Sequence, residues 1–279
     1  MSYKIVVDSC CDLPKEFHTD PRFEIVPLAL EVGDYHIIDD ESFNQQEFLE
    51  HVAASPECPK SACPSPDRYM SAYDCDADHV YCITLSSKLS GSYNSALLGR
   101  DLYLEEKGDK DIYVVDSLSA ASGETQIAYK LMELEEQGLS FEEIVEKINI
   151  CRDEMLTYFV LDSLETLRKN GRLSGMKALV ASTLSIKPVC AGDRGSIIQK
   201  GQGIGMRKAL VKMVDLIQKE CENSEEKRLI ITHCNCYERA MLVRDMVLKN
   251  MKFKETIVVD AAGVSSMYAN DGGIVVTCA

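Results

Sequence analysis

Short apolar runs alternate with helix-like segments through the first half of the chain. Two of these runs end in Asp-Ser, at Asp8-Ser9 and Asp116-Ser117, and each is short enough to be a buried strand. Strands are expected over 4–9, 79–85 and 111–117, and over 23–32 with an interruption at Pro27. Helices are expected over 93–104, 123–137 and 141–154. This alternation predicts a parallel α/β sheet.

The pattern changes near residue 155. Gly192–Gly195 separates two short strand-like runs and is typical of a hairpin turn. Strands are expected over 157–161, 188–190, 196–198, 228–232 and 255–259. Helices are expected over 163–169, 176–185, 206–220 and 237–250. We therefore predict two lobes, a parallel α/β lobe over 1–155 and a mixed α/β or α+β lobe over 156–279.

Composition and charge exclude several classes of function. The formal net charge of −15 disfavours nucleic acid and anionic membrane surfaces as partners. No apolar run approaches the ~20 residues that span a bilayer, so stable membrane insertion is not expected. The chain starts directly with a strand-like run, without a secretory signal.

The twelve cysteines are scattered, and no Cys-x-x-Cys pair occurs among them. The segment His233–Cys236 lacks a second half with the spacing of zinc ligands. We therefore expect reduced cysteines that pack as small apolar side chains, no metal site and no cofactor. This cysteine usage predicts a cytoplasmic protein.

Three turns combine hydroxyl side chains with glycine or proline at strand ends, where α/β sheets bind their ligands. The segment 86–93 presents serines and free backbone N–H groups, which can hold an anionic oxygen or simply cap the next helix. The proline-flanked loop 59–66 presents Ser61 either as a second hydroxyl donor or as part of a plain connection. Arg172, between two glycines, can bind an anion or stabilise its own loop.

These blocks also resemble the DegV family, and the resemblance runs over essentially the whole chain. The matching segments, in order, are Asp8-Ser9 with Asp12-Leu13, Pro27-Leu28, 60–65, 87–93, Asp116-Ser117, 167–175 and 187–189. The resemblance implies a two-lobed α/β protein that encloses one long-chain fatty acid. It also implies that the protein catalyses nothing alone, although some family members present the lipid to a separate fatty acid kinase subunit.

The resemblance assigns site residues as well. In family members, one hydroxyl of the proline-flanked loop and another of the Ser-Gly-Ser turn hold the fatty-acid carboxylate. The matching residues are Ser61, Ser90, Gly91 and Ser92. Such donors satisfy a carboxylate without burying a fixed positive charge. Arg172, Tyr268 and Asn270 are expected at the rim of the site or at a partner surface.

Four positions depart from the family pattern. Ala62 and Cys63 stand where serine and glutamine are usual, Tyr268 where histidine is frequent, and Ile204 where a basic residue is frequent. The last two changes weaken the case for phosphorylation by a partner kinase. They leave lipid binding unaffected, because it needs the serines and an apolar tunnel.

Other functions fit the residues less well. No Gly-x-Ser-x-Gly elbow occurs, which argues against a serine hydrolase. Gly201–Gly205 lacks the spacing and the lysine of a P-loop, and a loop between strand and helix is expected there. The alternatives left open are a subunit of a nucleotide- or phosphoryl-transfer enzyme with a small anionic substrate, and an interaction protein with an incidental lipid. The preferred interpretation is a monomeric fatty-acid carrier.

Overall fold

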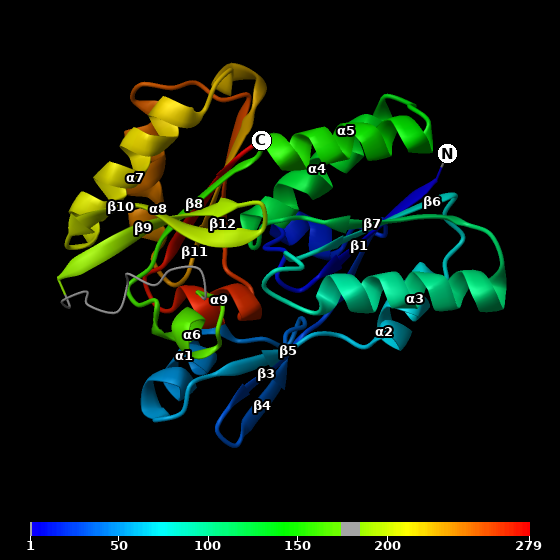
Figure 1. Cartoon of the computed structure of the whole chain (residues 1–279), viewed down its shortest axis with the longest axis horizontal. Coiled ribbons are helices and arrows are strands. Elements are labelled where there is room, and N and C mark those ends of the chain that lie inside the picture. Colours follow the sequence, from blue (N-terminus) through cyan, green and yellow to red (C-terminus); the bar gives the residue numbers. More distant parts are fainter. Residues whose placement is uncertain (1, 174–184) are drawn as a thin grey trace.

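The computed structural model describes residues 2–173 and 185–279, and within them the strands form three sheets. In Figure 1 a six-stranded sheet lies at the left, a four-stranded sheet at the right and a small three-stranded sheet at the bottom. The helix expected over 176–185 lies, except for its last residue, outside the described residues.

The four-stranded sheet is parallel, as predicted for the first half of the chain. Its order is β2-β1-β6-β7. It consists of β1 (Tyr3–Asp8), β2 (Phe23–Val26), β6 (His79–Thr84) and β7 (Asp111–Asp116). Since all four strands run in one direction, the turns that follow β1, β6 and β7 meet at one edge of the sheet.

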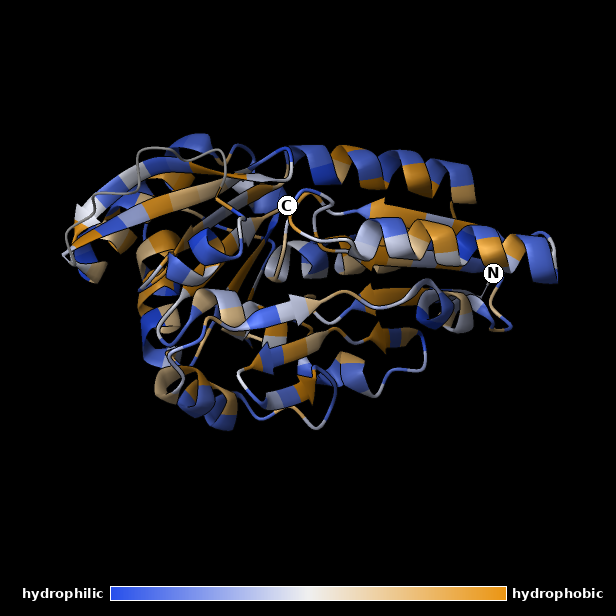
Figure 2. Ribbon diagram, turned by 60° about the horizontal axis from the view of Figure 1, so that its bottom comes forward, coloured by the Kyte–Doolittle hydropathy of each residue, from blue (hydrophilic) through white to orange (hydrophobic). Residues whose placement is uncertain are grey.

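Helices cover both faces of this sheet, which explains why its strands are apolar without alternation. Ile5 and Val7 of β1 pack against one pair of helices, and Val6 packs against the other pair. The first pair is α4 (Ser122–Glu136) and α5 (Phe141–Glu154); the second pair is α2 (Pro66–Tyr73) and α3 (Ser92–Lys107). Figure 2 shows the apolar strands between helices with one polar and one apolar side.

The strand predicted over 23–32 is in fact two strands in two different sheets. Pro27 separates β2 from the next strand, which leaves the parallel sheet and pairs antiparallel on both sides. The small sheet has the order β4-β3-β5 and consists of β3 (Ala29–Val32), β4 (Tyr35–Ile38) and β5 (Lys60–Ala62). The helices α1 (Gln45–Ala54) and α9 (Gly263–Ala269) pack together near it, and their apolar residues share one core with it.

The six-stranded sheet is mixed, as predicted for the second half. Only β11 and β12 pair in parallel, and the order is β10-β9-β8-β13-β11-β12. Its strands are β8 (Leu156–Val160), β9 (Ile186–Asp193), β10 (Ser196–Ile204), β11 (Arg228–His233), β12 (Glu255–Asp260) and β13 (Ile274–Cys278). The prediction omitted β13, although this strand occupies a central position between β8 and β11.

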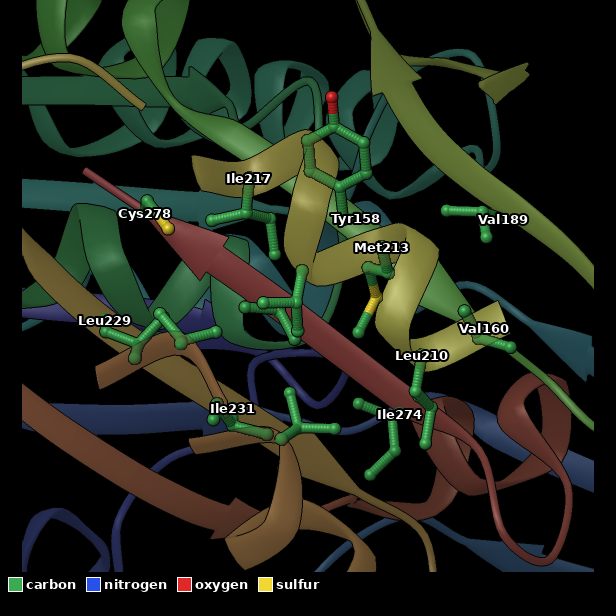
Figure 3. Close-up of a cluster of buried hydrophobic side chains, with 14 of the residues drawn as sticks. Tyr158, Val160, Val189, Leu210, Met213, Ile217, Leu229, Ile231, Ile274 and Cys278 are labelled. Carbon is green, nitrogen blue, oxygen red and sulfur yellow. The ribbon is translucent and has the colours of Figure 1, made fainter. Parts of the chain in front are cut away.

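One face of the mixed sheet is an ordinary helix-covered core. Figure 3 shows Met213 and Ile217 in one apolar cluster with Tyr158 and Ile231 of the strands. The covering helices are α7 (Met206–Glu220) and α8 (Tyr237–Leu248), while the short helix α6 (Glu165–Lys169) follows β8 on the other side. The opposite face of the sheet is not covered by α7 and α8.

The segment Gly201–Gly205 is not the loop that the sequence led us to expect. Strand β10 continues to Ile204, and Gly203 pairs with Lys187 of β9. A Cβ atom at Gly203 would lie 2.5 Å from the backbone carbon of Lys208, so glycine is required there for the close approach of α7. The hairpin turn, predicted over 192–195, is shorter in the structure, because Gly192 and Asp193 still belong to β9.

The two halves of the chain are tied by buried hydrogen bonds. Gln126 of α4 donates from Nε2 to the backbone oxygens of Arg228 (2.9 Å) and Thr277 (3.1 Å). A lobe boundary at residue 155, between α5 and β8, stays a prediction. Among the described residues, none of the helices is both long and apolar enough to cross a membrane.

Candidate ligand-binding site

A narrow cavity of about 110 Å³ lies between the edge of the parallel sheet and the free face of the mixed sheet. Its walls are almost wholly apolar, which favours an uncharged, elongated ligand body. The mixed sheet contributes Phe159, Leu161, Ile197 and Val275, and the loops and helices around it contribute Leu89, Leu118, Leu167 and Val264.

Four of the predicted site residues line the same cavity. These residues are Ser61 of β5, Ser90 in the turn after β6, Arg172 after α6, and Tyr268 of α9. They are separated by up to 207 positions in sequence, and the fold brings them to one site. Two hydroxyls, a phenol and a guanidinium form a donor set suited to a carboxylate.

Ser90 faces the cavity and also fixes the start of α3. Its Oγ accepts a hydrogen bond from the Ser92 N–H at 3.2 Å and lies 3.1 Å from the Ser92 Oγ. The sequence left open whether this turn binds an anion or caps a helix. Ser90 is placed for both roles, since it supports the start of α3 while it lines the cavity. Ser92 is fully buried behind it, and neither Ser92 nor Gly91 lines the cavity.

Arg172 is half-buried in the wall rather than displayed on an exposed surface. Its Nε donates to the Leu89 carbonyl at 3.1 Å, and its Nη1 donates to the Asn170 carbonyl at 2.5 Å. These bonds join the turn that carries Arg172 to the turn after β6. The guanidinium keeps further N–H donors, since it has five in total.

Tyr268 supplies the phenol at the position where we expected altered chemistry. Burial raises the pKa of Tyr268, while the nearby Ser61 hydroxyl and the Arg172 charge act in the opposite direction. The neutral phenol is therefore the stable form and can donate a hydrogen bond. Asn270 has a different position: it ends α9 with φ of 57° and donates to the carbonyls of Tyr268 and Ser163, outside the cavity wall.

The other departures from the family pattern lie away from the cavity wall. Ala62 and Cys63 are exposed, because β5 turns only Ser61 inward. Ile204 is 67 % exposed at the end of β10. These three positions affect the outer surface of the protein.

Buried carboxyl groups lie directly beside the cavity, and the sequence analysis assigned them no role. Asp8 is fully buried, and burial raises its pKa to about 6 although it accepts the N–H groups of Leu85 and Cys10. Burial raises the pKa of Asp12 to about 7. Burial and the Asp8 charge raise the pKa of Glu124 well above its usual range, so this group is a neutral acid. A neutral Glu124 can donate its proton to the neighbouring Asp8 carboxylate.

Asp39 anchors the helix that carries Tyr268. Its two oxygens accept the N–H groups of Gly263 (2.7 Å) and Val264 (2.8 Å) at the start of α9. A carboxylate at the N-terminus of a helix accepts hydrogen bonds from the free N–H groups there and interacts favourably with the helix dipole. Asp39, which directly follows β4, thus fixes the start of the helix that carries Tyr268.

The apolar wall is what the sequence analysis missed. Thr157, Phe159 and Leu161 alternate along β8 and its continuation, and all three face the cavity. The alternation was visible in the sequence, but a period of two does not reveal which of two faces meets a ligand. Among the described residues, no group of three or more His, Cys, Asp or Glu side chains is placed to hold a metal ion.

A family model described as "Uncharacterised protein, DegV family" matches residues 2–278. The chain belongs to the DegV family. A DegV domain-containing protein of Streptococcus gordonii is 35% identical over 277 residues, covering 98% of both chains. The resemblance found in the sequence is therefore confirmed, together with the α/β fold.

Solved DegV structures carry fatty acids. A DegV protein from Ruminococcus gnavus, refined with vaccenic acid, is 48% identical with a TM-score of 0.97, covering 99% of each chain. The Fatty Acid Kinase (Fak) B3 protein of Streptococcus pneumoniae, loaded with linoleic acid, is 32% identical with a TM-score of 0.90, also covering 99% of each chain. DegV relatives with the same fold as this chain thus bind long-chain fatty acids.

Proposed function

We propose that this DegV protein binds one long-chain fatty acid in its cavity and has no catalytic activity of its own. The observation that carries the proposal is the combination of an apolar wall with Ser61, Ser90, Arg172 and Tyr268 at one site. The carboxylate accepts hydrogen bonds from these donors, and the acyl chain lies along the face of the mixed sheet. Each buried CH₂ group contributes about 0.8 kcal/mol, so the tail dominates the affinity and the donors set the orientation.

The bound lipid is presented to a separate kinase subunit that supplies ATP chemistry. Streptococcus pneumoniae Fak B3 supports this step by its name and similarity. Arg172 and Tyr268 supply donors at the carboxylate even though histidine is absent at position 268. All twelve cysteines are free, which fits the proposed location in a reducing cytoplasm. A monomer stays our prediction for the oligomeric state.

No specific observation favours the nucleotide- or phosphoryl-transfer alternative. The glycine-rich segment belongs to β10 and packs on α7, so its backbone N–H groups do not form a phosphate cradle. The apolar wall also offers nothing to a small, highly charged substrate.

The test is mass spectrometry of the organic extract from the native purified protein, with Ser90→Ala and Ser61→Ala beside the wild type. We expect one fatty acid per chain in the wild type and about 1–3 kcal/mol weaker binding in Ser90→Ala, since a buried acceptor loses its donor. Ser87→Ala is the matched control in the same turn, because Ser87 does not line the cavity. An extract without lipid, together with failure to take up added fatty acid, contradicts the proposal.

A further inference from the structure

The cavity has two ends that differ in chemistry. Thr157, Phe159 and Leu161 face it from alternate positions along β8 and the residue that follows this strand. The cavity therefore follows the chain for about 13 Å at ~3.3 Å per residue. Leu161 packs in one buried cluster with Leu167, and the Arg172 N–H donates to the Leu167 carbonyl at 2.8 Å. Leu161 therefore marks the end near Arg172. Thr157 marks the opposite end.

Four residues close that opposite end, and we call them the end wall: Leu118, Ser119, Thr157 and Gly192. The Oγ of Ser119 and the Oγ1 of Thr157 are hydrogen-bonded at 2.8 Å, which joins the loop after β7 to the first part of β8. Gly192 lies against this pair, since a Cβ atom there would be 3.5 Å from the Thr157 Cβ. One hydroxyl donates to the other, so the pair shares one hydrogen bond across the end wall.

Leu118 is held in the end wall by a strained turn. Its φ is +51°, a left-handed conformation that is uncommon for a leucine. Its N–H donates to the Asp116 Oδ1 at 3.2 Å, and the following N–H donates to the Ser117 Oγ at 3.1 Å. These bonds fix the backbone, so the side chain has a defined position against the hairpin of β9 and β10, where Gly195 approaches it.

A second, wider cleft of about 690 Å³ lies directly behind the end wall. Leu118, Thr157 and Gly192 line both spaces, so the partition is one residue thick. Most of the remaining residues that line the cleft are charged: Arg152, Asp153, Glu154, Asp193, Arg194, Lys200 and Glu220. An acyl chain that passed the wall would therefore leave an apolar space for a polar one.

We propose that the end wall determines the longest acyl chain that the protein accepts. This inference rests on the proposed function, because it concerns the same fatty acid. The terminal methyl group meets Leu118 and Thr157, and any further carbon atoms must displace the wall or enter the polar cleft. Each CH₂ group that is exposed rather than buried lowers the affinity about fourfold.

The test offers each purified protein an equimolar mixture of even-numbered saturated fatty acids of twelve to twenty-two carbons. The acids retained after gel filtration are identified by mass. Leu118→Ala and Thr157→Ala open the partition, and we expect the ratio of the twenty-carbon to the sixteen-carbon acid to rise at least about tenfold, as two or more newly covered CH₂ groups require. Gly192→Ala adds a methyl group in ordinary contact distance, and we expect the opposite shift.

The matched control is Ile198→Ala, because Ile198 lines the cleft but not the cavity. Retention of the wild-type chain-length profile by all three end-wall variants overturns the inference while the proposed function stands. An equal shift in Ile198→Ala overturns it as well. A wild type that retains no acid contradicts the proposed function itself, and the inference falls with it.

Discussion

The two large sheets contribute to the cavity in different ways. The parallel sheet contributes its edge, because Cys10, Ser90 and Ser119 follow the ends of β1, β6 and β7. The mixed sheet contributes its face, through side chains such as Phe159 and Val275. Turns at an edge offer hydroxyl and N–H groups, whereas the backbone of a paired strand is already satisfied and presents only side chains. Under the proposed function, the edge contributes Ser90 to recognition of the carboxylate, and the face contributes the side chains that cover the tail.

The largest expected effect comes from placing a charge on the face. In Phe159→Asp, a carboxylate replaces a wall residue that is 8 % exposed, and an unpaired buried charge is strongly unfavourable. We expect fatty-acid affinity to fall at least about hundredfold, as ~3 kcal/mol would give, in a displacement assay with a fluorescent fatty acid. Ile150→Asp, on the half-exposed side of α5, is the control for an apolar-to-charged change. Unchanged affinity in Phe159→Asp would mean that the tail does not lie on this face.

The next effect concerns the helix that joins the edge to the face. In Gly263→Ala, the new Cβ atom would lie 2.6 Å from the Asp39 Cγ and 2.8 Å from the Leu30 Cδ1. We expect the free energy of unfolding to fall by about 1–3 kcal/mol in urea titrations, because the anchor of α9 must shift. Gly192→Ala, whose Cβ meets nothing closer than 3.5 Å, should leave stability nearly unchanged. Equal stability of the two variants would refute this account of α9.

The edge should also be sensitive to pH. Burial raises the folded-state pKa of Asp12 to about 7, above the ~4 of an unfolded chain, so the folded state binds its proton more tightly. The contribution of this group to stability is therefore fully present below about pH 4 and is lost as the pH rises through about 7. Asp8, Asp39 and Glu124 act in the same direction.

The variant Asp12→Asn removes one of these titrations while its amide oxygen can still accept the Ala262 N–H. We expect a flatter dependence of the urea midpoint on pH between about 4 and 7. The control Asp67→Asn changes an exposed carboxylate of α2 and should follow the wild type. A slope equal to that of the wild type in Asp12→Asn would show that this group does not titrate in the window.

The smallest effect is expected from the phenol at the polar end. Tyr268→Phe keeps the ring and removes only the hydroxyl, so we expect about 0.5–1 kcal/mol weaker binding, measured by the same displacement assay. Tyr237→Phe, on the exposed start of α8, is the control. A loss much larger than that would make Tyr268, rather than the serines, the main donor to the carboxylate.

Local signals predicted the elements that local contacts define. The bounds of α5 were predicted as observed, because Ser140 and Glu143 form a capping box at its start. The helix α9 was not predicted, since its first N–H groups bind Asp39, 224 residues earlier in the chain. The strand β13 was missed for the same reason, because its pairing with β8 spans more than a hundred residues.

In the candidate site, too, local motifs identified some residues, whereas residues that depend on long-range packing were missed. Ser61, Ser90, Arg172 and Tyr268 were named from motifs, and the fold places all four at the cavity. The motif around Ser90 also included Ser92, which is buried behind it, because a motif does not specify the direction of a side chain. The apolar wall could not be predicted from motifs, because it forms only when two sheets from distant parts of the chain pack together.

The central position of β13 has a consequence for the order of events during synthesis. Strand β13 follows every other strand of its sheet in the chain, yet β8 and β11 both pair with it. Until Ile274–Cys278 leaves the ribosome, those two strands lack their common neighbour and the cavity lacks Val275. A parallel sheet completed by β7 can form much earlier, since early segments fold first during synthesis. The wall of the cavity is therefore complete only after β13 has been inserted, and under the proposed function uptake of a fatty acid follows that step.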